Sequence, residues 1–372
     1  MSPVVLVHFS PVELYPPIQN LVRVLEKEAS NRQFVLITTI PSVDLTLFEA
    51  SSVQIKRKGK IDVKASAWRR FVNYIFFHLF TLQFLIRYRP DTVIYFETLS
   101  SFPVYLYKRY IKRGARIFIH YHEYTSTDEY QNGRRLPRLF HLLEKKLYAG
   151  ARWVSHTNEV RMKKFKEDIS PLIISNDHLL PNYPPSTWRT NPPVVNTLPI
   201  KIIYAGALSL STMYTREFAE WVLDQDGKAV WDIYSFNYSP DARDYLTGLN
   251  SPWIRFNQGV NYDRLPTVLR AYHAGVILYK GHTPNYVYNA PNKLFEYLVC
   301  GLDVWFPKEM RGCYPYITEG HYPKVVCIDF RELHQLDLQS LISKENHEFQ
   351  DRGFYCEPVY ENFYQVVTKN QG

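Results

Sequence analysis

Several features are scarce or missing in this chain, and each absence narrows what the protein can be. It has only four cysteines in 372 residues, all in the last quarter: Cys300, Cys313, Cys327 and Cys356. They show no CxxC spacing and have no histidine at zinc-finger distance. This pattern argues against a disulfide scaffold or a zinc finger and favours a reduced, cytoplasmic protein. No low-complexity or acidic tract is present, so we expect the whole chain to fold.

Targeting and nucleic-acid signals are also missing. The N-terminal residues enter a strand-like segment without a basic region or a cleavage site, so we expect no secretory signal. The longest apolar stretch, within 71–88, has about 16 mostly apolar residues, whereas a membrane-spanning helix needs about 20. No Cys/His finger or aromatic RNA-binding strand appears, so we expect no nucleic-acid partner.

The composition is that of a globular protein with an anionic partner. The hydrophobic fraction is 46% and the charged fraction is 22%, and this length predicts two domains. The net charge of +8 favours a phosphate-bearing substrate, an acidic lipid or a nucleic acid. Charge alone does not choose among these three.

Strand-like and helix-like segments alternate along both halves of the chain. In the first half, we expect strands at 4–9, 34–39, 92–96, 116–121 and 153–156, with helices at 18–29, 67–88, 104–112, 136–149 and 159–165. In the second half, we expect strands at 200–205, 231–236, 254–256, 275–279 and 304–306, with helices at 215–223, 241–249, 262–273 and 292–300. This alternation predicts an α/β protein with mainly parallel, doubly wound sheets of the Rossmann type.

A proline-rich stretch separates the two halves. Residues 181–199 contain six prolines, which exclude both a helix and a central strand. We therefore predict an N-terminal domain at 1–180, a linker at 181–199 and a C-terminal domain at 200–357. Residues 358–372 would form a final helix that returns to the first domain. Two such domains are expected to leave a cleft, with ligands beyond the carboxyl ends of the strands.

The segment 56–86 combines positive charge with aromatic residues. Its basic residues are Lys56, Arg57, Lys58, Lys60, Lys64, Arg69 and Arg70, and an aromatic-rich helix follows them. One interpretation is a helix that rests on an anionic membrane surface. The other is an ordinary helix that covers the sheet.

The stretch 275–304 carries the most chemical information. After a strand and a polar loop, a helix opens at Pro291-Asn292-Lys293, where free backbone amides and an ammonium would suit a diphosphate. Glu296 lies on the same helix face and could accept ribose hydroxyls. The plain alternative is a solvated ion pair between Lys293 and Glu296.

The segment PNKLFEYLVCGLDV, which starts at Pro291, resembles the donor site of GT-B glycosyltransferases, especially the group 1 or family 4 enzymes. The resemblance implies that Lys293 helps to hold the donor diphosphate and that Glu296 holds the ribose. Further similarities are the strand and turn ending at Gly206, the Pro181-Asn182 pair and the final helix at 358–367. The resemblance therefore covers most of the chain.

Two departures from the family pattern affect the donor site. Many retaining members carry a second glutamate where this chain has Tyr288, next to Asn289. The basic pair that usually follows the glycine turn is absent, since Ala207 follows Gly206 and the nearest cation is Arg216. We therefore count Arg216, Tyr288 and Asn289 among the donor-site candidates, with Lys280 and His282 as alternative sources of positive charge.

The acceptor side of the reaction has candidates in the first half. His120 and His122 point the same way at the end of a predicted strand, and Glu123 begins the next loop. Histidine can act as a base near neutral pH, and the resemblance favours His122 or Glu123 near the reacting centre. A histidine pair packed under a helix is the alternative. By position, Glu97 and Glu13 are secondary candidates.

We expect no metal site. Asp224-Gln225-Asp226 matches a metal-binding DxD pattern, but it follows a helix and precedes Gly227, which predicts a surface turn. The leaving diphosphate can be stabilised by fixed positive charge instead. No cofactor is expected, because the nucleotide-sugar is a substrate.

Together these features predict transfer of a hexose-type sugar from a UDP- or GDP-sugar to a polysaccharide or lipid-linked acceptor. We expect this at the cytoplasmic face of the plasma membrane. Two alternatives stay open: an epimerase or hydrolase of nucleotide-sugars on the same fold, and a non-catalytic relative that only binds them.

Overall fold

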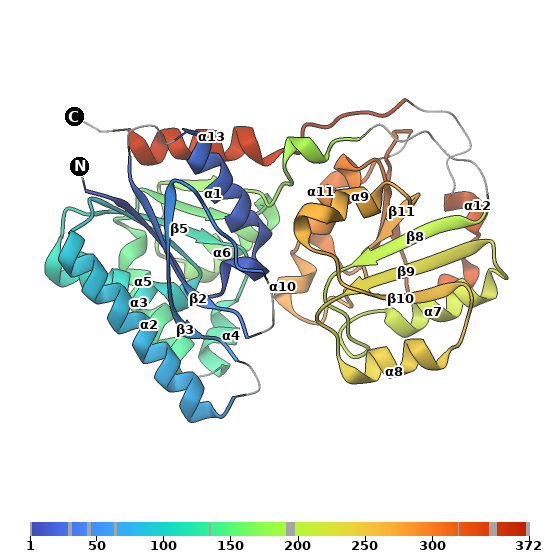
Figure 1. The fold of residues 1–372 in the computed structure, drawn as a ribbon, viewed down its shortest axis with the longest axis horizontal. Coiled ribbons are helices and arrows are strands. Elements are labelled where there is room, and N and C mark those ends of the chain that lie inside the picture. The colour runs from blue at the N-terminus through green and yellow to red at the C-terminus, as the bar shows by residue number, and fades with distance from the viewer. Residues whose placement is uncertain are drawn as a thin grey trace. The chain divides into compact units, whose positions relative to one another are not determined.

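The computed structural model describes residues 2–28, 32–42, 46–62, 65–133, 135–190, 198–318, 320–341 and 348–369. Residues 191–197 of the predicted linker, Lys64 and residues 370–372 lie outside this part. The chain divides into two compact units, Met1–Asn182 with Cys356–Gly372 (unit 1) and Tyr183–Tyr355 (unit 2). Each unit is a parallel sheet flanked by helices (Figure 1). The predicted α/β class with two Rossmann-like sheets is confirmed.

Unit 1 contains a seven-stranded sheet in the order β3-β2-β1-β4-β5-β6-β7. Its strands are β1 (Val4–His8), β2 (Phe34–Ile40), β3 (Val53–Lys60), β4 (Thr92–Phe96), β5 (Arg116–Tyr121), β6 (Trp153–His156) and β7 (Asp177–Leu179). All neighbouring strands pair in parallel. The chain winds outward from β1 to β3 and then resumes at β4 on the other side of β1. The carboxyl ends of β1 and β4 therefore form the topological switch point, where ligands bind in such sheets.

Two groups of helices cover this sheet (Figure 1). The helices of unit 1 are α1 (Pro16–Glu28), α2 (Ala67–Tyr88), α3 (Ser101–Leu106), α4 (Thr127–Asn132), α5 (Arg135–Tyr148), α6 (Glu159–Ile169) and α13 (Cys356–Thr368). Ser66 caps α2 by accepting the backbone N–H of Arg69 at 3.4 Å, and the helix ends at Arg89 in a left-handed conformation. None of the helices that the structure describes is long and apolar enough to cross a membrane.

The last helix, α13, belongs to unit 1, although all of unit 2 lies between it and the rest of unit 1 in sequence. The Tyr364 hydroxyl donates to the Glu28 carbonyl at the end of α1, at 3.0 Å. The ring of Phe363 is buried against Phe118 of β5 and Trp153 of β6, with centroids 6.0 and 5.0 Å away. Helix α13 therefore supplies part of the core of unit 1.

Unit 2 contains a six-stranded sheet in the order β10-β9-β8-β11-β12-β13. Its strands are β8 (Ile200–Ala205), β9 (Ala229–Ser235), β10 (Ile254–Gln258), β11 (Ala274–Val276), β12 (Asp303–Pro307) and β13 (Val325–Ile328). Its helices are α7 (Thr215–Asp224), α8 (Pro240–Gly248), α9 (Leu265–Leu269), α10 (Pro284–Val287), α11 (Asn292–Val299) and α12 (Leu338–Leu341). The switch point of this sheet lies between β8 and β11.

The core of unit 2 has two parts, one on each face of the sheet. Ile202 and Tyr204 of β8 pack in the cluster that includes α7, while Ile203 between them packs with α11. This alternation is the two-residue period of a strand that is buried on both sides. Helix α11 is thereby fixed against the strands that lead to the switch point.

Candidate functional site

The switch point of unit 2 brings together two residues that lie far apart in sequence. Gly206 follows β8 with φ of +143°, a conformation that side chains other than glycine rarely adopt. A Cβ atom at this position would lie 2.5 Å from Lys293 Nζ and 2.7 Å from Lys293 Cε. The ammonium of α11 therefore lies directly against the glycine turn, and any side chain at 206 would displace it.

Aromatic rings hold Lys293 in this position. Its Nζ lies 5.4 Å from the ring centroid of Tyr204 and 5.8 Å from that of Tyr279, which is within cation–π range. Tyr279 in turn stacks on Tyr286, with centroids 4.6 Å apart and planes at 9°. Helix α11 begins at Asn292 after Pro291, and no side chain caps its start. The first backbone amides of α11 are therefore left uncapped by a side chain, and the Lys293 ammonium of its first turn lies at Gly206.

Glu296 lies one turn further along α11 and is buried, with 6% of its surface exposed. Burial raises the pKa of its carboxyl to about 7, and the nearby Lys293 ammonium opposes that shift. Within the described residues, no donor is hydrogen-bonded to this carboxylate. It is therefore an acceptor without a protein donor, of the kind that ligand hydroxyls can satisfy.

Tyr297, near the end of α11, fixes this helix to the sheet. Its hydroxyl accepts the backbone N–H of Ala205 at 3.1 Å. Its ring covers Gly275 of β11 so closely that a Cβ there would lie 2.1 Å from the ring. The glycine in β11 thus allows α11 to approach the sheet at the switch point.

The other predicted donor-site residues have different surroundings. Arg216, in the first turn of α7, is exposed and places its guanidinium 4.4 Å from the Tyr245 ring centroid on α8. Tyr288 and Asn289 are half-buried and press their backbones against Gly312, where a Cβ would lie 2.4 to 2.5 Å from them. Lys280 forms an ion pair with Glu217 at 2.8 Å.

In unit 1, the two predicted histidines of β5 and its following loop are buried side by side. Their ring centroids are 4.4 Å apart, and His120 Nε2 lies 3.2 Å from His122 Nδ1. His122 Nδ1 also lies 3.3 Å from Asn182 Oδ1, and His120 Nδ1 lies 2.8 Å from Ser155 Oγ. Burial lowers the pKa of His122 to about 4. His122 is therefore neutral at physiological pH.

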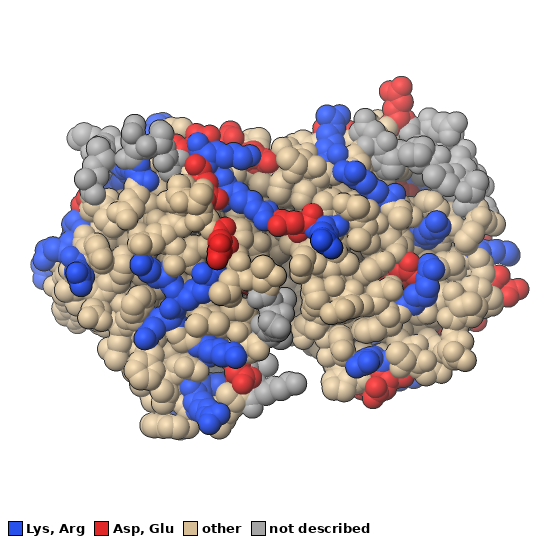
Figure 2. Space-filling model, viewed as in Figure 1, with Lys and Arg blue, Asp and Glu red and all other residues tan. Residues whose placement is uncertain are grey.

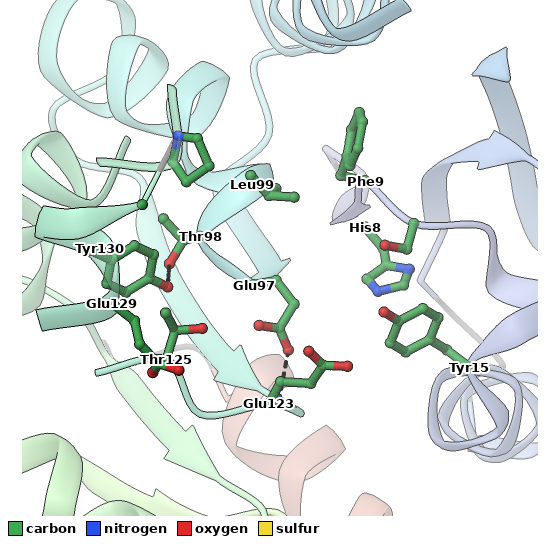
Figure 3. Close-up of a pocket in the computed structure, with 13 residues that line it drawn as sticks. His8, Phe9, Tyr15, Glu97, Thr98, Leu99, Glu123, Thr125, Glu129 and Tyr130 are labelled. Carbon is green, nitrogen blue, oxygen red and sulfur yellow. Dashed lines mark hydrogen bonds between the residues drawn. The ribbon is translucent and has the colours of Figure 1, made fainter. Parts of the chain in front are cut away.

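Glu123 lies beside a second carboxyl, that of Glu97, at the carboxyl ends of β5 and β4. Both line a cavity of about 230 Å³ at the switch point of unit 1. Glu97 Oε1 accepts the backbone N–H groups of His122 at 2.6 Å and Glu123 at 3.1 Å. Figure 3 shows the Glu97 and Glu123 side chains next to each other, with the Glu123 carboxyl on the side of Tyr15.

The sequence missed most residues of this cavity. Tyr15, Thr125, Glu129 and Tyr130 lie in loops or short helices, and no motif marks them. Glu97 was among the secondary candidates because it directly follows a predicted strand, and His8, near the end of the first predicted strand, could have been found by the same topological argument. Because two strands must meet before such a cavity exists, a linear pattern cannot outline it.

The remaining acidic candidates, Glu13 and the pair of Asp224 and Asp226, lie in an ion pair and in a turn. Glu13 Oε1 forms an ion pair with Arg57 at 2.7 Å and accepts the Phe48 N–H at 3.1 Å. Asp224 ends α7, and Asp226 follows in a turn with φ of 46°. No group of three or more His, Cys, Asp or Glu side chains that could hold a metal occurs among the residues that the structure describes.

No family model and no curated protein matches this sequence. Solved structures match it over its whole length. Sucrose-phosphate synthase from Thermosynechococcus elongatus has a TM-score of 0.71 and 13% identity over 98% of each chain. HepE from Anabaena, in complex with UDP and glucose, has a TM-score of 0.65 and 10% identity over 100% of both chains. A Listeria monocytogenes protein described as a UDP-N-acetylglucosamine 2-epimerase has a TM-score of 0.59 and 12% identity, over 99% of this chain and 96% of that one.

At these identities the likeness concerns the fold, and it extends through both units. The two parallel sheets of this chain have the same architecture as the matched structures. The chain therefore has the GT-B fold.

Proposed function

We propose that this chain is a glycosyltransferase that moves a hexose-type sugar from a UDP- or GDP-linked donor to a polysaccharide or lipid-linked acceptor. The observation that supports this most is the Lys293 ammonium resting on the Gly206 turn, beside the start of α11. A diphosphate placed there would meet fixed positive charge and backbone amides, which stabilise it as it leaves. Glu296 would accept the ribose hydroxyls. His122 and Glu123 stay our predictions for the reacting centre.

The proposed reaction uses no resident cofactor and no metal. The nucleotide-sugar is consumed as a substrate, and the charge that develops on the leaving diphosphate is met by Lys293 and the amides of α11. The transfer rate is therefore expected to stay unchanged when EDTA is added. A rate that falls with EDTA and recovers with Mg²⁺ or Mn²⁺ would refute metal independence.

We further propose that unit 1 contacts an anionic membrane surface on the cytoplasmic side, where a lipid-linked acceptor would be found. Large apolar side chains are exposed along one side of α2, at Trp68, Phe71, Ile75, Phe76, Leu79 and Ile86 (the α2 stripe). Figure 2 shows basic side chains gathered over the region where Figure 1 draws β3 and α2. An apolar stripe beside basic residues fits lipid headgroups and acyl chains together.

Donor binding can be tested by thermal unfolding with UDP-, GDP- and dTDP-sugars. A donor at about 100 times its dissociation constant should stabilise the wild type by about 2.7 kcal/mol, and a tenfold weaker variant by about 1.4 kcal/mol. We expect Lys293→Met to bind the donor at least about tenfold more weakly and so to be stabilised less than the wild type. The matched control is Lys228→Met, because Lys228 is exposed and distant in sequence from the site. An equal response in all three proteins would refute this donor site.

An epimerase or hydrolase is the second candidate, because the Listeria structure has the same fold. The two functions differ in their need for an acceptor. An epimerase or hydrolase would consume the nucleotide-sugar with no acceptor present, whereas a transferase would require one. A non-catalytic relative would bind the donor and leave it intact in both conditions.

A further inference from the structure

Glu97 has a backbone conformation that is costly for any residue except glycine. Its φ and ψ are 63° and 151°, at the end of β4, the middle strand of the seven. Backbone hydrogen bonds hold it there, from its own N–H to the His120 carbonyl and from the Ser100 N–H to its carbonyl, each at 3.0 Å. The fold therefore maintains a carboxyl side chain where glycine would cost less. Such outliers cluster at functional sites.

The carboxyl group of Glu97 is held by one oxygen. Its Oε1 accepts both loop amides described above, and the side chain lines the cavity. Burial and the neighbouring Glu123 carboxylate raise the pKa of Glu97 to about 8, while the two amides and the buried Arg161 act in the opposite direction. The tethered group can therefore exchange a proton near neutral pH.

The rest of the cavity offers hydroxyl groups and further carboxylates. Thr98, Thr125, Tyr130 and Tyr15 line it with hydroxyls, and Glu123 and Glu129 line it with carboxylates. Thr98 Oγ1 is already engaged, at 2.7 Å from both Tyr130 Oη and Glu144 Oε2. The described lining residues include no lysine or arginine. A lining whose charged side chains are carboxylates disfavours phosphate and carboxylate ligands and favours hydroxyl and ammonium groups.

We propose that this cavity binds the sugar acceptor as an uncharged or amine-bearing polyol, and that Glu97 accepts the proton of its attacking hydroxyl. This inference rests on the proposed glycosyl transfer. The acceptor oxygen forms a bond to the anomeric carbon of the donor sugar. The bond from that carbon to the diphosphate oxygen breaks, and its electron pair leaves with the nucleoside diphosphate. The acceptor proton moves to the Glu97 carboxylate, so no further reactant is needed.

Acceptor class can be tested on the full chain by saturation-transfer NMR. The probes are methyl glucoside, glucosamine and glucose 6-phosphate. We expect signals for methyl glucoside and glucosamine and none for glucose 6-phosphate. Equal signals for glucose 6-phosphate, or none for the first two sugars while nucleotide-sugar still binds, would overturn this inference and leave the proposed function standing. Failure of the wild type to bind any nucleotide-sugar would overturn both.

The role of Glu97 can be tested by Glu97→Gln, which retains an oxygen to accept the two amides but cannot take the proton. We expect transfer to fall at least about 100-fold with nucleotide-sugar affinity unchanged. The matched control is Asp128→Asn, on the exposed side of α4. Equal activity of Glu97→Gln and the wild type would overturn the assignment.

The pH profile distinguishes Glu97 from His122. With Glu97 as the base, kcat/KM should rise with pH through a midpoint near 8, since the carboxyl must be ionised. Glu123→Gln removes a negative charge beside Glu97 and should move this midpoint to lower pH. This variant remains informative if Glu97→Gln folds poorly. A midpoint near 4, the pKa of His122, or one that stays in place in Glu123→Gln, would overturn the proposal.

Discussion

The Lys293 side chain lies against Gly206, so a substitution at either position should change the position or the stability of the other residue. Gly206→Ala adds a Cβ at 2.5 Å from the ammonium and places a side chain at φ of +143°. We expect a loss of about 1 to 3 kcal/mol in the free energy of unfolding together with weaker nucleotide-sugar binding. Chemical denaturation and calorimetric titration would measure the two effects.

A double-mutant cycle separates the clash from the backbone strain. In Gly206→Ala/Lys293→Ala the ammonium is gone, so the stability losses should not add, with a coupling of about 0.5 to 3 kcal/mol. Gly248→Ala is the control, because no atom lies within 4 Å of a Cβ at that position. Strictly additive losses would show that Lys293 does not contact the turn.

If Glu296 holds the ribose as proposed, its carboxyl should make donor affinity depend on pH. Its pKa of about 7 means that it is mostly protonated at pH 6 and mostly ionised at pH 8. Ribose hydroxyls bind better to the ionised form, so affinity for a nucleotide-sugar should rise about tenfold across this range. Titration calorimetry at both values would measure the rise.

Glu296→Gln is the matched variant for this pH effect. The amide does not titrate, so the affinity should be the same at pH 6 and pH 8. Nucleotide-sugars suit the experiment because their diphosphate is esterified at both ends and keeps its charge. A wild-type affinity that does not change with pH would count against Glu296 as the ribose ligand.

At the scale of elements, helix α2 has two apolar sides with different roles. Phe77, His78, Thr81, Phe84 and Leu85 are buried, while the α2 stripe is exposed. Phe76→Ser/Leu79→Ser should lower binding to vesicles that contain anionic lipid by at least about tenfold, because each side chain contributes about 1.5 to 3 kcal/mol on burial. Vesicle co-sedimentation would measure it.

The control for the stripe is Ile173→Ser, since Ile173 is 82% exposed but lies outside α2. Binding should also weaken as salt concentration rises, because the basic residues contribute through screened attraction. If the control and the double variant bind vesicles equally, α2 is a covering helix and nothing more.

His78 is an imidazole buried under α2 among aromatic rings, including Phe140 at 5.1 Å and Phe102 at 5.8 Å between centroids. Neither ring nitrogen has a hydrogen-bond partner, and burial lowers its pKa from 6.5 to about 4. The folded state thus binds fewer protons than the unfolded state, so stability is lost as pH falls from 6.5 towards 4.

His78→Phe should remove this penalty. We expect the free energy of unfolding to rise by about 1 kcal/mol at pH 7. At pH 5 the rise should be larger than at pH 7 by about 2 kcal/mol. Urea unfolding, followed by hydrogen exchange in β4 and β5, would measure both. His334→Phe is the control, because His334 is 66% exposed. A gain that is the same at both pH values would show that His78 is not a buried neutral histidine.

The strands that the sequence did not predict share a position in the sheets. β3 and β7 form the edges of the first sheet, and β13 forms one edge of the second. An edge strand has partial solvent contact, so it lacks the continuous apolar run of an interior strand. β3 carries lysine and arginine along most of its length. Helix 262–273 is also shorter than predicted, since α9 spans only Leu265–Leu269.

At the scale of the whole molecule, the alternation of strands and helices was enough to predict both parallel sheets. Apolar runs in the sequence predict the interior strands, and the alternation of these strands with helices predicts that the sheets are parallel. The donor cluster required the resemblance as well, because only that linked Gly206 to Lys293. The order of the strands pointed to Glu97 as a candidate, but it did not indicate the backbone conformation of Glu97 or the other residues of the cavity, since these arise where β4 and β5 end side by side. These features depend on tertiary structure.

Helix α13 has a consequence for how the protein is made. This helix is synthesised only after unit 2, yet its buried Tyr360, Phe363 and Val367 complete the core of unit 1, most of which precedes unit 2 in sequence. A nascent chain that ends before Cys356 should therefore carry an uncovered apolar surface next to α1 and β5 for most of translation. Limited proteolysis of stalled nascent chains should cut the first 180 or so residues readily until α13 has emerged, and then much more slowly.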